Sequence, residues 1–134
     1  MTKYRVAKKW IFSREEVYEF ARLTGDTNPM HLDANKARAD GLSDLSVHGA
    51  LQIARFTAFI GSGGFMSGST CMTVSGEFRK PLYPEKDYLV VLTCREAIAG
   101  LGIFSAECTV TDDSNHCLAK LTCDFKIDRK LKQT

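Results

Sequence analysis

The sequence predicts a single α+β domain in which an antiparallel β-sheet wraps around one long central helix. Residues 46–60 read S-V-H-G-A-L-Q-I-A-R-F-T-A-F-I and are apolar on nearly every side, which is typical of a buried helix. Strand candidates follow this helix at 71–78, 88–97, 101–111 and Cys117–Ile127. The last of them places apolar residues at every second position, which indicates a half-buried antiparallel strand.

The N-terminal part of the chain shows where its first elements begin and end. A first strand is expected to end at residues 10–12, which read W-I-F. Ser13 and Glu16 then form a capping box, the pattern with which many helices begin. Gly25 is well placed to end that helix, because glycine readily adopts the left-handed conformation found at helix ends.

A second, short helix is predicted at 34–39. Asp33 can cap its first turn, and Gly41 stops it. The loop 26–31 between the two helices is therefore expected to be held at both ends.

Length and composition favour one soluble globular domain over residues 1–134. The chain has 134 residues, of which 44% are hydrophobic and 25% charged, and this suits a single core. Its net charge of +2, from 18 basic and 16 acidic residues, gives no reason to expect a nucleic-acid partner. No apolar run is long enough for a signal peptide or a membrane span, so we expect a cytoplasmic protein without a membrane partner.

The cysteines and histidines form no metal-binding motif in the sequence. The cysteines are odd in number and contain no C-x-x-C pair, so we expect reduced thiols that fill the core: Cys71, Cys94, Cys108, Cys117 and Cys123. The histidines, His31, His48 and His116, show no ligand spacing, and we expect neither a metal nor a cofactor. We expect His48 to be structural and His116 to be exposed in a hairpin turn.

An acid and an imidazole lie five positions apart in T-G-D-T-N-P-M-H-L-D, at Asp26 and His31. The nearby Gly and Pro indicate that loop backbone holds both side chains, so that they can converge on one target. A carboxylate and an imidazole that share one water can make it nucleophilic and manage its protons. The simpler alternative is that Asp26 makes an Asx turn and His31 is a structural residue.

The wider segment around this motif resembles a known enzyme family. The residues F-A-R-L-T-G-D-T-N-P-M-H-L-D-A-N-K-A-R-A-D-G, and then V-H-G-A-L, are similar to the MaoC-like (R)-specific enoyl-CoA hydratases of the hot-dog fold. The similarity runs over 20–57, and F-R-K-P-L-Y-P at 78–84 resembles the F-x-x-P element of that family. Glu85, Lys86 and Asp87 stand where the family often has Gly-Asp, which leaves the shape of that loop and its coenzyme A contacts open.

The resemblance implies a single hot-dog domain that reversibly hydrates a trans-2-enoyl-CoA to the (R)-3-hydroxyacyl-CoA. It assigns Asp26 and His31 as the catalytic dyad, with Asp26 favoured as the base and His31 orienting the water and moving protons. It places Gly49 at the start of the central helix, where a backbone N–H stabilises the thioester oxyanion. It also gives Asn28 an orienting hydrogen bond, and it makes Thr57 a small polar residue that faces the substrate.

Three of these residues also have a simpler explanation. Gly49 can be a helix-start glycine that close packing requires. Asn28 precedes a proline, and an asparagine at such a position is equally typical of a turn. Thr57 can donate a hydrogen bond to the backbone of its own helix.

The resemblance further implies a homodimer or larger homo-oligomer, because relatives pair two domains into one extended sheet. The expected partner is an acyl-CoA substrate, with the same thioester on an acyl carrier protein as the other candidate. The acyl chain would then occupy a tunnel between subunits. Arg79 and Lys80 are candidates to meet the phosphates of coenzyme A.

A hot-dog thioesterase and a non-catalytic acyl-CoA-binding domain are the alternatives. Thioesterases of this fold commonly use an acid on or near the central helix, whereas residues 45–76 contain no Asp or Glu. The acyl-carrier-protein dehydratases of the same fold use a His-Phe-Pro type motif, which this sequence lacks. A domain that only binds acyl-CoA is expected to lose the dyad, and here Asp26, His31 and Gly49 are all present.

Overall fold

The computed structural model describes residues 3–62, 67–98 and 100–127. In chain order their elements are β1 (Lys3–Ile11), α1 (Arg14–Thr24), α2 (Pro29–Leu32), α3 (Ala34–Ala39), α4 (Gly49–Gly61), β2 (Ser69–Phe78), β3 (Asp87–Ile98), β4 (Ile103–Thr111) and β5 (Cys117–Ile127). Among the helices of these residues, none is both long enough and apolar enough to cross a membrane.

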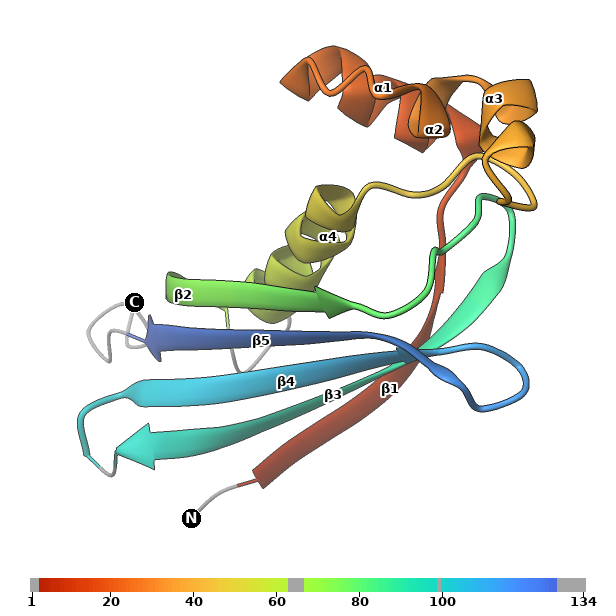
Figure 1. Cartoon of the computed structure of the whole chain (residues 1–134). Coiled ribbons are helices and arrows are strands. Elements are labelled where there is room, and N and C mark those ends of the chain that lie inside the picture. Colours follow the sequence, from red (N-terminus) through yellow and green to blue (C-terminus); the bar gives the residue numbers. More distant parts are fainter. Residues whose placement is uncertain (1–2, 63–66, 99, 128–134) are drawn as a thin grey trace.

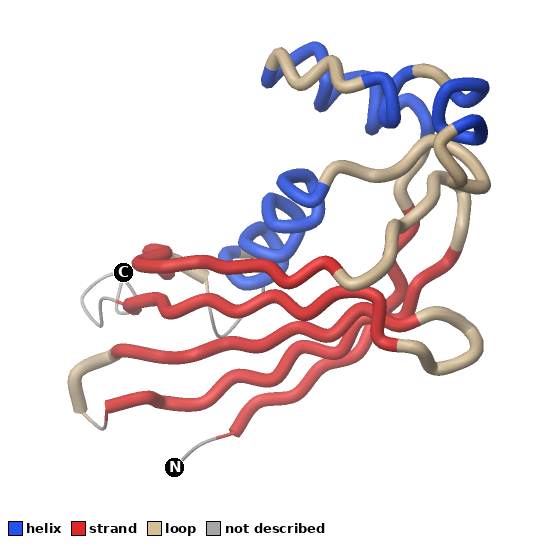
Figure 2. Tube along the Cα trace, in the orientation of Figure 1, coloured by secondary structure: helices blue, strands red, loops and turns tan. Residues whose placement is uncertain are grey.

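The strands form one antiparallel sheet in the order β1-β3-β4-β5-β2 (Figures 1 and 2). Helix α4 lies against one face of this sheet over β2 and β5, while α1, α2 and α3 gather beyond one end of the strands (Figure 1). The predicted α+β class, with an antiparallel sheet and a central helix, is confirmed. The four predicted strands lie within two residues of the observed boundaries at each end.

The hydrophobic core lies between α4 and the inner face of the sheet. Phe56 and Ile60 of α4 are buried together with alternate residues of the three central strands, among them Val90, Leu92, Cys108, Val110, Leu121 and Phe125. The alternation predicted for β5 is confirmed. Leu121 and Phe125 are buried, whereas Asp124 and Lys126, the residues on either side of Phe125, are exposed. Burial of this apolar area is the main force that holds the helix on the sheet.

Helix α4 begins at Gly49, as the resemblance implied, so residues 46–48 of the apolar run lie before the helix. The residues before it bond to other segments of the chain instead of continuing the helix. The Ser46 N–H donates to the Met30 carbonyl oxygen at 2.9 Å, and the Val47 N–H donates to the Leu82 carbonyl oxygen at 2.8 Å. These tertiary hydrogen bonds therefore set where the helix starts.

The prediction that α4 is buried on nearly every side is wrong for the single chain. Gln52, Phe56 and Ile60 form its buried face, whereas the opposite face exposes small residues: Ala50, Ala54 and Ala58. The sheet covers one side of the helix only. Alanines expose little apolar area, so the uncovered side costs little in water.

Strand β2 is an edge strand that is exposed along nearly its whole length. It carries large apolar side chains, and Met72, Val74 and Phe78 are 55%, 39% and 44% exposed. An uncovered edge with apolar residues is a surface that can pair with another strand.

Helix α1 has the boundaries that the sequence predicted. The Ser13 hydroxyl accepts from the Glu16 N–H at 3.0 Å, and the Glu16 carboxylate accepts from the Ser13 N–H at 3.1 Å. Gly25 adopts a left-handed φ of 78°, and its N–H donates to the Ala21 carbonyl oxygen at 2.9 Å. Asp33 caps α3 with its side chain, as predicted.

The cysteines are free thiols on strands, but they do not all lie in the core. Cys94, Cys108 and Cys123 are buried, and burial raises the pKa of Cys94 to about 11 and that of Cys108 to about 12. These thiols therefore stay protonated and unreactive at neutral pH. The prediction of a core position is wrong for Cys71, which is exposed on the edge strand β2.

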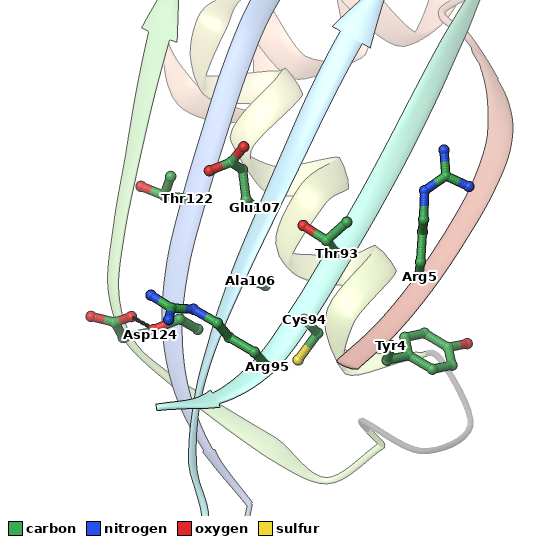
Figure 3. Close-up of a pocket in the computed structure, with 10 residues that line it drawn as sticks. Tyr4, Arg5, Thr93, Cys94, Arg95, Ala106, Glu107, Thr122 and Asp124 are labelled. Atoms are coloured by element: carbon green, nitrogen blue, oxygen red, sulfur yellow. Dashed lines mark hydrogen bonds between the residues drawn. The ribbon is translucent and has the colours of Figure 1, made fainter. Parts of the chain in front are cut away.

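The face of the sheet opposite α4 carries a broad hollow, here called the outer groove (Figure 3). Its volume is about 660 Å³, and its lining includes Arg95, Glu107 and Asp124 from neighbouring strands. Several of its polar groups are paired with each other or with the rim. The Ser105 hydroxyl donates to Asp124 at 2.6 Å, and the Lys120 ammonium lies 3.5 Å from the Glu107 carboxylate.

Candidate active site

The segments that carry the motif residues meet at the N-terminal end of α4, around a second hollow, here called the α4 pocket. Its volume is about 330 Å³. It lies between α2, the segment before α4 and the turn after β2, and its lining includes His31, Ser46, Gly49, Gln52 and Phe78. Folding thus brings together residues that are far apart in the sequence.

Asp26 lies in the loop after α1, where local hydrogen bonds shape the backbone. Its N–H donates to the Thr24 hydroxyl at 3.3 Å, and its Oδ1 accepts from the Asn28 N–H at 3.4 Å. The second bond is the Asx turn that was the simpler explanation of this residue. It engages one carboxylate oxygen, and the second oxygen is not needed for the turn.

His31 lies on α2, a one-turn helix, so the prediction that loop backbone holds it is wrong. Pro29 occupies the first turn, where its missing N–H removes no helical hydrogen bond. Asn28 caps the helix, because its Oδ1 accepts from the Met30 N–H at 3.4 Å. The N-P-M-H sequence therefore forms a small rigid support for His31.

The His31 ring is 8% exposed and has a fixed orientation. Its Nδ1 lies 2.7 Å from the Ser46 carbonyl oxygen and 3.2 Å from the Ser46 hydroxyl. A carbonyl oxygen only accepts, so Nδ1 carries the proton and donates. In the neutral ring Nε2 then keeps its lone pair and can accept a hydrogen bond or a proton.

An ion pair steadies the segment that leads into α4. The Arg14 guanidinium donates to both carboxylate oxygens of Asp44, with Nη1 to Oδ1 at 2.9 Å, and Asp44 also accepts from the Leu45 N–H at 2.7 Å. The hydrogen bond from Arg14 holds the pKa of Asp44 below its ordinary value. The pair lies two residues before Ser46, whose carbonyl orients His31.

A second imidazole, that of His48, stacks on the first. The ring centroids of His31 and His48 are 3.7 Å apart with 23° between the planes, and Phe20 meets His48 edge-on at 5.0 Å. One polar side-chain atom from each of Asp26, His31 and His48 lies within 4.8 Å of the other two. Burial lowers the pKa of His48, His31 lowers it further, and Asp26 opposes the shift. The His48 ring is therefore neutral at pH 7.

By distance alone this cluster could hold a metal ion, which the sequence spacing did not suggest. The stacking of the rings argues against it. An imidazole nitrogen binds a metal along a lone pair in the plane of its ring. Two nearly parallel rings 3.7 Å apart direct these lone pairs side by side rather than toward one point. We therefore assign no metal to these three residues.

Gly49 is the first residue of α4, where backbone N–H groups point out of the helix. A Cβ at this position would lie 2.9 Å from two ring atoms of Phe78, and a Cβ on Gly76 would lie 2.6 Å from the Phe78 Cζ. Phe78 therefore packs against two glycines. A substrate carbonyl that reaches the Gly49 N–H would pass beside this ring.

Of the other predicted residues, Arg79 and Lys80 line the α4 pocket, whereas Thr57 does not. Thr57 lies two turns along α4, and its hydroxyl donates to the Ala54 carbonyl oxygen at 3.0 Å, which is the alternative given for it above. The N–H groups of Arg79 and Lys80 donate to the Leu118 carbonyl oxygen at 2.9 and 3.1 Å, which fixes the turn that carries them.

Sequence reasoning missed Gln52 and underrated His48. Gln52 is 2% exposed, and its Oε1 has no hydrogen-bond partner among the described residues. The same is true of both ring nitrogens of His48. The signal was present, because these two polar residues lie one helical turn apart in an otherwise apolar run, and buried polar groups require partners.

Nearly the whole chain matches one family of known proteins. The MaoC like domain family matches residues 2–124. The chain belongs to this family. The MaoC-like family includes (R)-hydratases and 3-hydroxyacyl dehydratases, and the resemblance seen in the sequence is confirmed.

The MaoC-like domain has the fold of solved (R)-hydratases. It superposes on the (R)-hydratase from A. caviae involved in PHA biosynthesis with a TM-score of 0.81 and 23% identity, over 95% of each chain. It superposes on R-hydratase PhaJ1 from Pseudomonas aeruginosa with a TM-score of 0.83 and 20% identity, over 95% of this chain and 81% of the other. This likeness confirms the hot-dog fold.

Among curated proteins, the MaoC-like domain matches part of a longer one. The mitochondrial 3-hydroxyacyl-[acyl-carrier-protein] dehydratase of Arabidopsis thaliana is 33% identical over 73 residues, which are 54% of this chain and 43% of that protein. The chain therefore spans less than half the length of this relative.

The MaoC-like domain departs from the family pattern after the F-x-x-P element, and the structure shows how. Glu85 adopts a left-handed φ of 63°, a conformation that favours glycine, in the stretch where the family often has Gly-Asp. Its N–H donates to the Phe12 carbonyl oxygen at 2.7 Å, and its carboxylate accepts from the Arg14 N–H at 2.9 Å. The glutamate side chain thus ties this turn to the start of α1.

Proposed function

We propose that this MaoC-like domain adds water to the 2,3 double bond of a trans-2-enoyl thioester and catalyses the reverse dehydration of the (R)-3-hydroxyacyl thioester. The observation that carries the proposal is Asp26 beside a His31 ring whose Nδ1–H is anchored on the Ser46 carbonyl. This arrangement offers one water a carboxylate and an imidazole lone pair. These are the groups needed to activate the water and to transfer its protons.

In the proposed reaction Asp26 accepts a proton from the water while the water oxygen bonds to C3. The electron pair of the double bond moves toward the thioester carbonyl, whose oxygen becomes enolate-like. His31 holds the water through Nε2, and the proton returns through the dyad to C2. One water is consumed, the protonation state of the protein is restored, and no cofactor is required.

The enolate oxygen needs a stabilising donor, for which we propose the Gly49 N–H. It lies at the N-terminus of a 13-residue helix, where the helix dipole favours negative charge. Asn28 supports the dyad in this proposal by capping α2 and orienting His31. Thr57 retains its proposed contact with substrate only if its hydroxyl leaves Ala54.

We propose that coenzyme A carries the acyl chain of the substrate, with acyl carrier protein as the second candidate. Both carriers present phosphate groups on a pantetheine arm. Lys80 and Arg79 line the α4 pocket and can meet such phosphates. Arg79 also pairs with Glu77 at 2.9 Å, so a phosphate would compete with this exposed ion pair. The name of the Arabidopsis relative supports the carrier-protein candidate.

We propose a homodimer in which the β2 strands of two copies pair. The support is the exposed edge of β2 with its apolar residues Met72, Val74 and Phe78. Light scattering after size exclusion is expected to give twice the mass of 14.9 kDa. A monomer at micromolar concentration would contradict this part of the proposal.

The test of the reaction uses crotonyl-CoA, whose conjugated double bond absorbs in the ultraviolet, together with a thiol reagent. Loss of absorbance without release of free thiol is expected for the hydratase, and the Asp26→Asn and His31→Ala variants should abolish it. Longer enoyl chains and the carrier-protein thioester are assayed in parallel.

Two other outcomes would contradict the proposal. Release of free coenzyme A would indicate a thioesterase, which the lack of an acidic residue on α4 argues against. Binding without turnover of any chain length would indicate an acyl-CoA-binding domain.

A further inference from the structure

His48 is a buried polar residue whose hydrogen bonds the fold leaves unmade. It is 1% exposed, and neither Nδ1 nor Nε2 has a hydrogen-bond partner among the described residues. It is the N-cap residue of α4, yet its side chain does not cap the helix. Buried polar groups in native proteins are nearly always bonded, so both nitrogens call for a partner.

Packing alone does not explain a histidine here. The ring lies between the face of His31, at 3.7 Å, and the edge of Phe20, at 5.0 Å. A phenylalanine could fill the same space and would leave no polar atom unpaired. Phenylalanine lacks what histidine supplies here, a ring nitrogen within reach of Asp26 and His31.

The distances indicate what could bond these nitrogens. One polar side-chain atom each of His48, Asp26 and His31 lies within 4.8 Å of the other two, and no side-chain hydrogen bond joins His48 to either neighbour. The Asp26 backbone lies close enough to raise the pKa of His48, but neither ring nitrogen has a hydrogen-bond partner at normal distance among the described residues. One water can bridge two polar groups at such a separation. In the proposed hydration the reactant between Asp26 and His31 is itself a water.

We infer that His48 is a positioning residue that holds the water shared with Asp26 and His31. This inference rests on the proposed function, because its expected effect on kcat requires that the protein hydrates an enoyl thioester. A neutral imidazole carries one N–H donor and one acceptor, so it can donate to the water or to the Asp26 carboxylate without adding charge. Of the titratable groups, Asp26 and His31 act on His48, and burial together with His31 favours the neutral ring.

The decisive variant is His48→Phe, which keeps a ring between His31 and Phe20 but removes both nitrogens. We expect kcat for crotonyl-CoA to fall roughly 10- to 100-fold while KM changes less than about twofold, because a bond to the reacting water is lost. The His48→Asn and His48→Gln variants each restore an N–H, and at least one should recover part of kcat. His116→Phe is the matched control, since His116 is exposed in a turn and bonds only to Asp112.

A His48→Phe variant with unchanged kcat and an unchanged melting temperature would overturn the inference and leave His48 as a packing residue. If all three His48 variants lose activity equally and melt earlier, the residue is structural and the inference also fails.

A second readout separates this inference from the proposed function. Side-chain ¹⁵N correlation spectra of the three histidines should show His48 as one neutral tautomer near pH 7. Its nitrogen shifts should change in Asp26→Asn, whereas those of His116 should not. If the wild-type protein hydrates no substrate but the His48 nitrogen shifts change in Asp26→Asn, the proposed function fails and the contact of His48 with Asp26 stands. If the His48 shifts do not change in Asp26→Asn, the contact is overturned.

Discussion

The outer groove and the α4 pocket differ in size and in how their polar groups are bonded. The outer groove is about twice as large, about 660 Å³ against about 330 Å³. Its carboxylates are engaged on the surface, with Asp124 bonded to Ser105 and Glu107 near Lys120. Gln52, which lines the α4 pocket, and the buried His48, which stacks on His31 of that lining, have polar atoms without a hydrogen-bond partner among the described residues.

The comparison teaches that volume is a poor guide to the site in this protein. Carboxylates that already have partners, as Asp124 and Glu107 do in the outer groove, gain little from binding a ligand. A small pocket with buried, unpaired donors and acceptors gains hydrogen bonds when a polar substrate or water enters. Six substitutions test this difference, from the largest expected effect to the smallest.

An Asp→Asn substitution should reduce activity strongly near the α4 pocket and hardly at all in the outer groove. Asp26→Asn removes the proposed base and should lower kcat for crotonyl-CoA by roughly 10³-fold. Asp124→Asn in the outer groove should leave kcat within about twofold, because among the described residues the Asp124 carboxylate bonds only to the strand residues Ser105 and Thr73. Steady-state kinetics of both variants check this, and a strong loss in Asp124→Asn would remove the distinction between the regions.

Gly49→Ala tests the need for space at the start of α4. The new Cβ would lie 2.9 Å from the Phe78 ring, so this half-exposed ring must move into the α4 pocket or away from it. We expect kcat/KM to fall roughly 10- to 100-fold from misplacement of the thioester. Gly61→Ala on the same helix meets no atom of the described residues within 4 Å and should leave kcat/KM unchanged while stabilising the helix by about 0.5 kcal/mol.

Asp44→Asn tests the ion pair that supports the α4 pocket. We expect the free energy of unfolding to fall by roughly 1 kcal/mol at pH 7, because the partly exposed Arg14 loses its charged acceptor. The pKa of Asp44 in the folded protein lies below its ordinary value of 3.8, so this stabilisation is present above that pH and is lost as the pH falls through the folded-state pKa. Urea unfolding across this range should show the two proteins converging in acid; a constant difference would mean that the charge is not involved.

Glu107→Gln in the outer groove should have the smallest effect. The ion pair with Lys120 is exposed on both sides, so the free energy of unfolding should change by less than about 0.5 kcal/mol and kcat should not change. Thermal unfolding at low and high salt, beside the activity assay, checks both expectations. A larger loss of activity would show that the outer groove takes part in catalysis.

Local sequence predicted much of this molecule. The capping box at Ser13 and the glycine at 25 fixed α1, because caps depend on neighbouring residues only. Period-two alternation placed the strands for the same reason. The T-G-D-T-N-P-M-H-L-D motif indicated the family and the dyad. The cytoplasmic location and the extent of a single domain over 1–134 stay predictions.

Other features depended on contacts between distant segments. The apolar run 46–60 extends three residues before α4, because Ser46 and Val47 bond to Met30 and Leu82, and no local signal reveals such bonds. The exposure of Cys71 and of one face of α4 reflects which layers cover them, which hydrophobic pattern alone does not specify.

The sequence by itself determined the fold class, the helix caps and the identity of the Asp26 and His31 motif, since each is written in residues close together along the chain. Only the tertiary structure decided that His48 stacks on His31, that Gln52 faces the α4 pocket and that Thr57 bonds its own helix. The direction and burial of a side chain are set when separate elements pack against each other. The hydrogen-bond partners of a buried polar side chain are therefore known only from the folded protein.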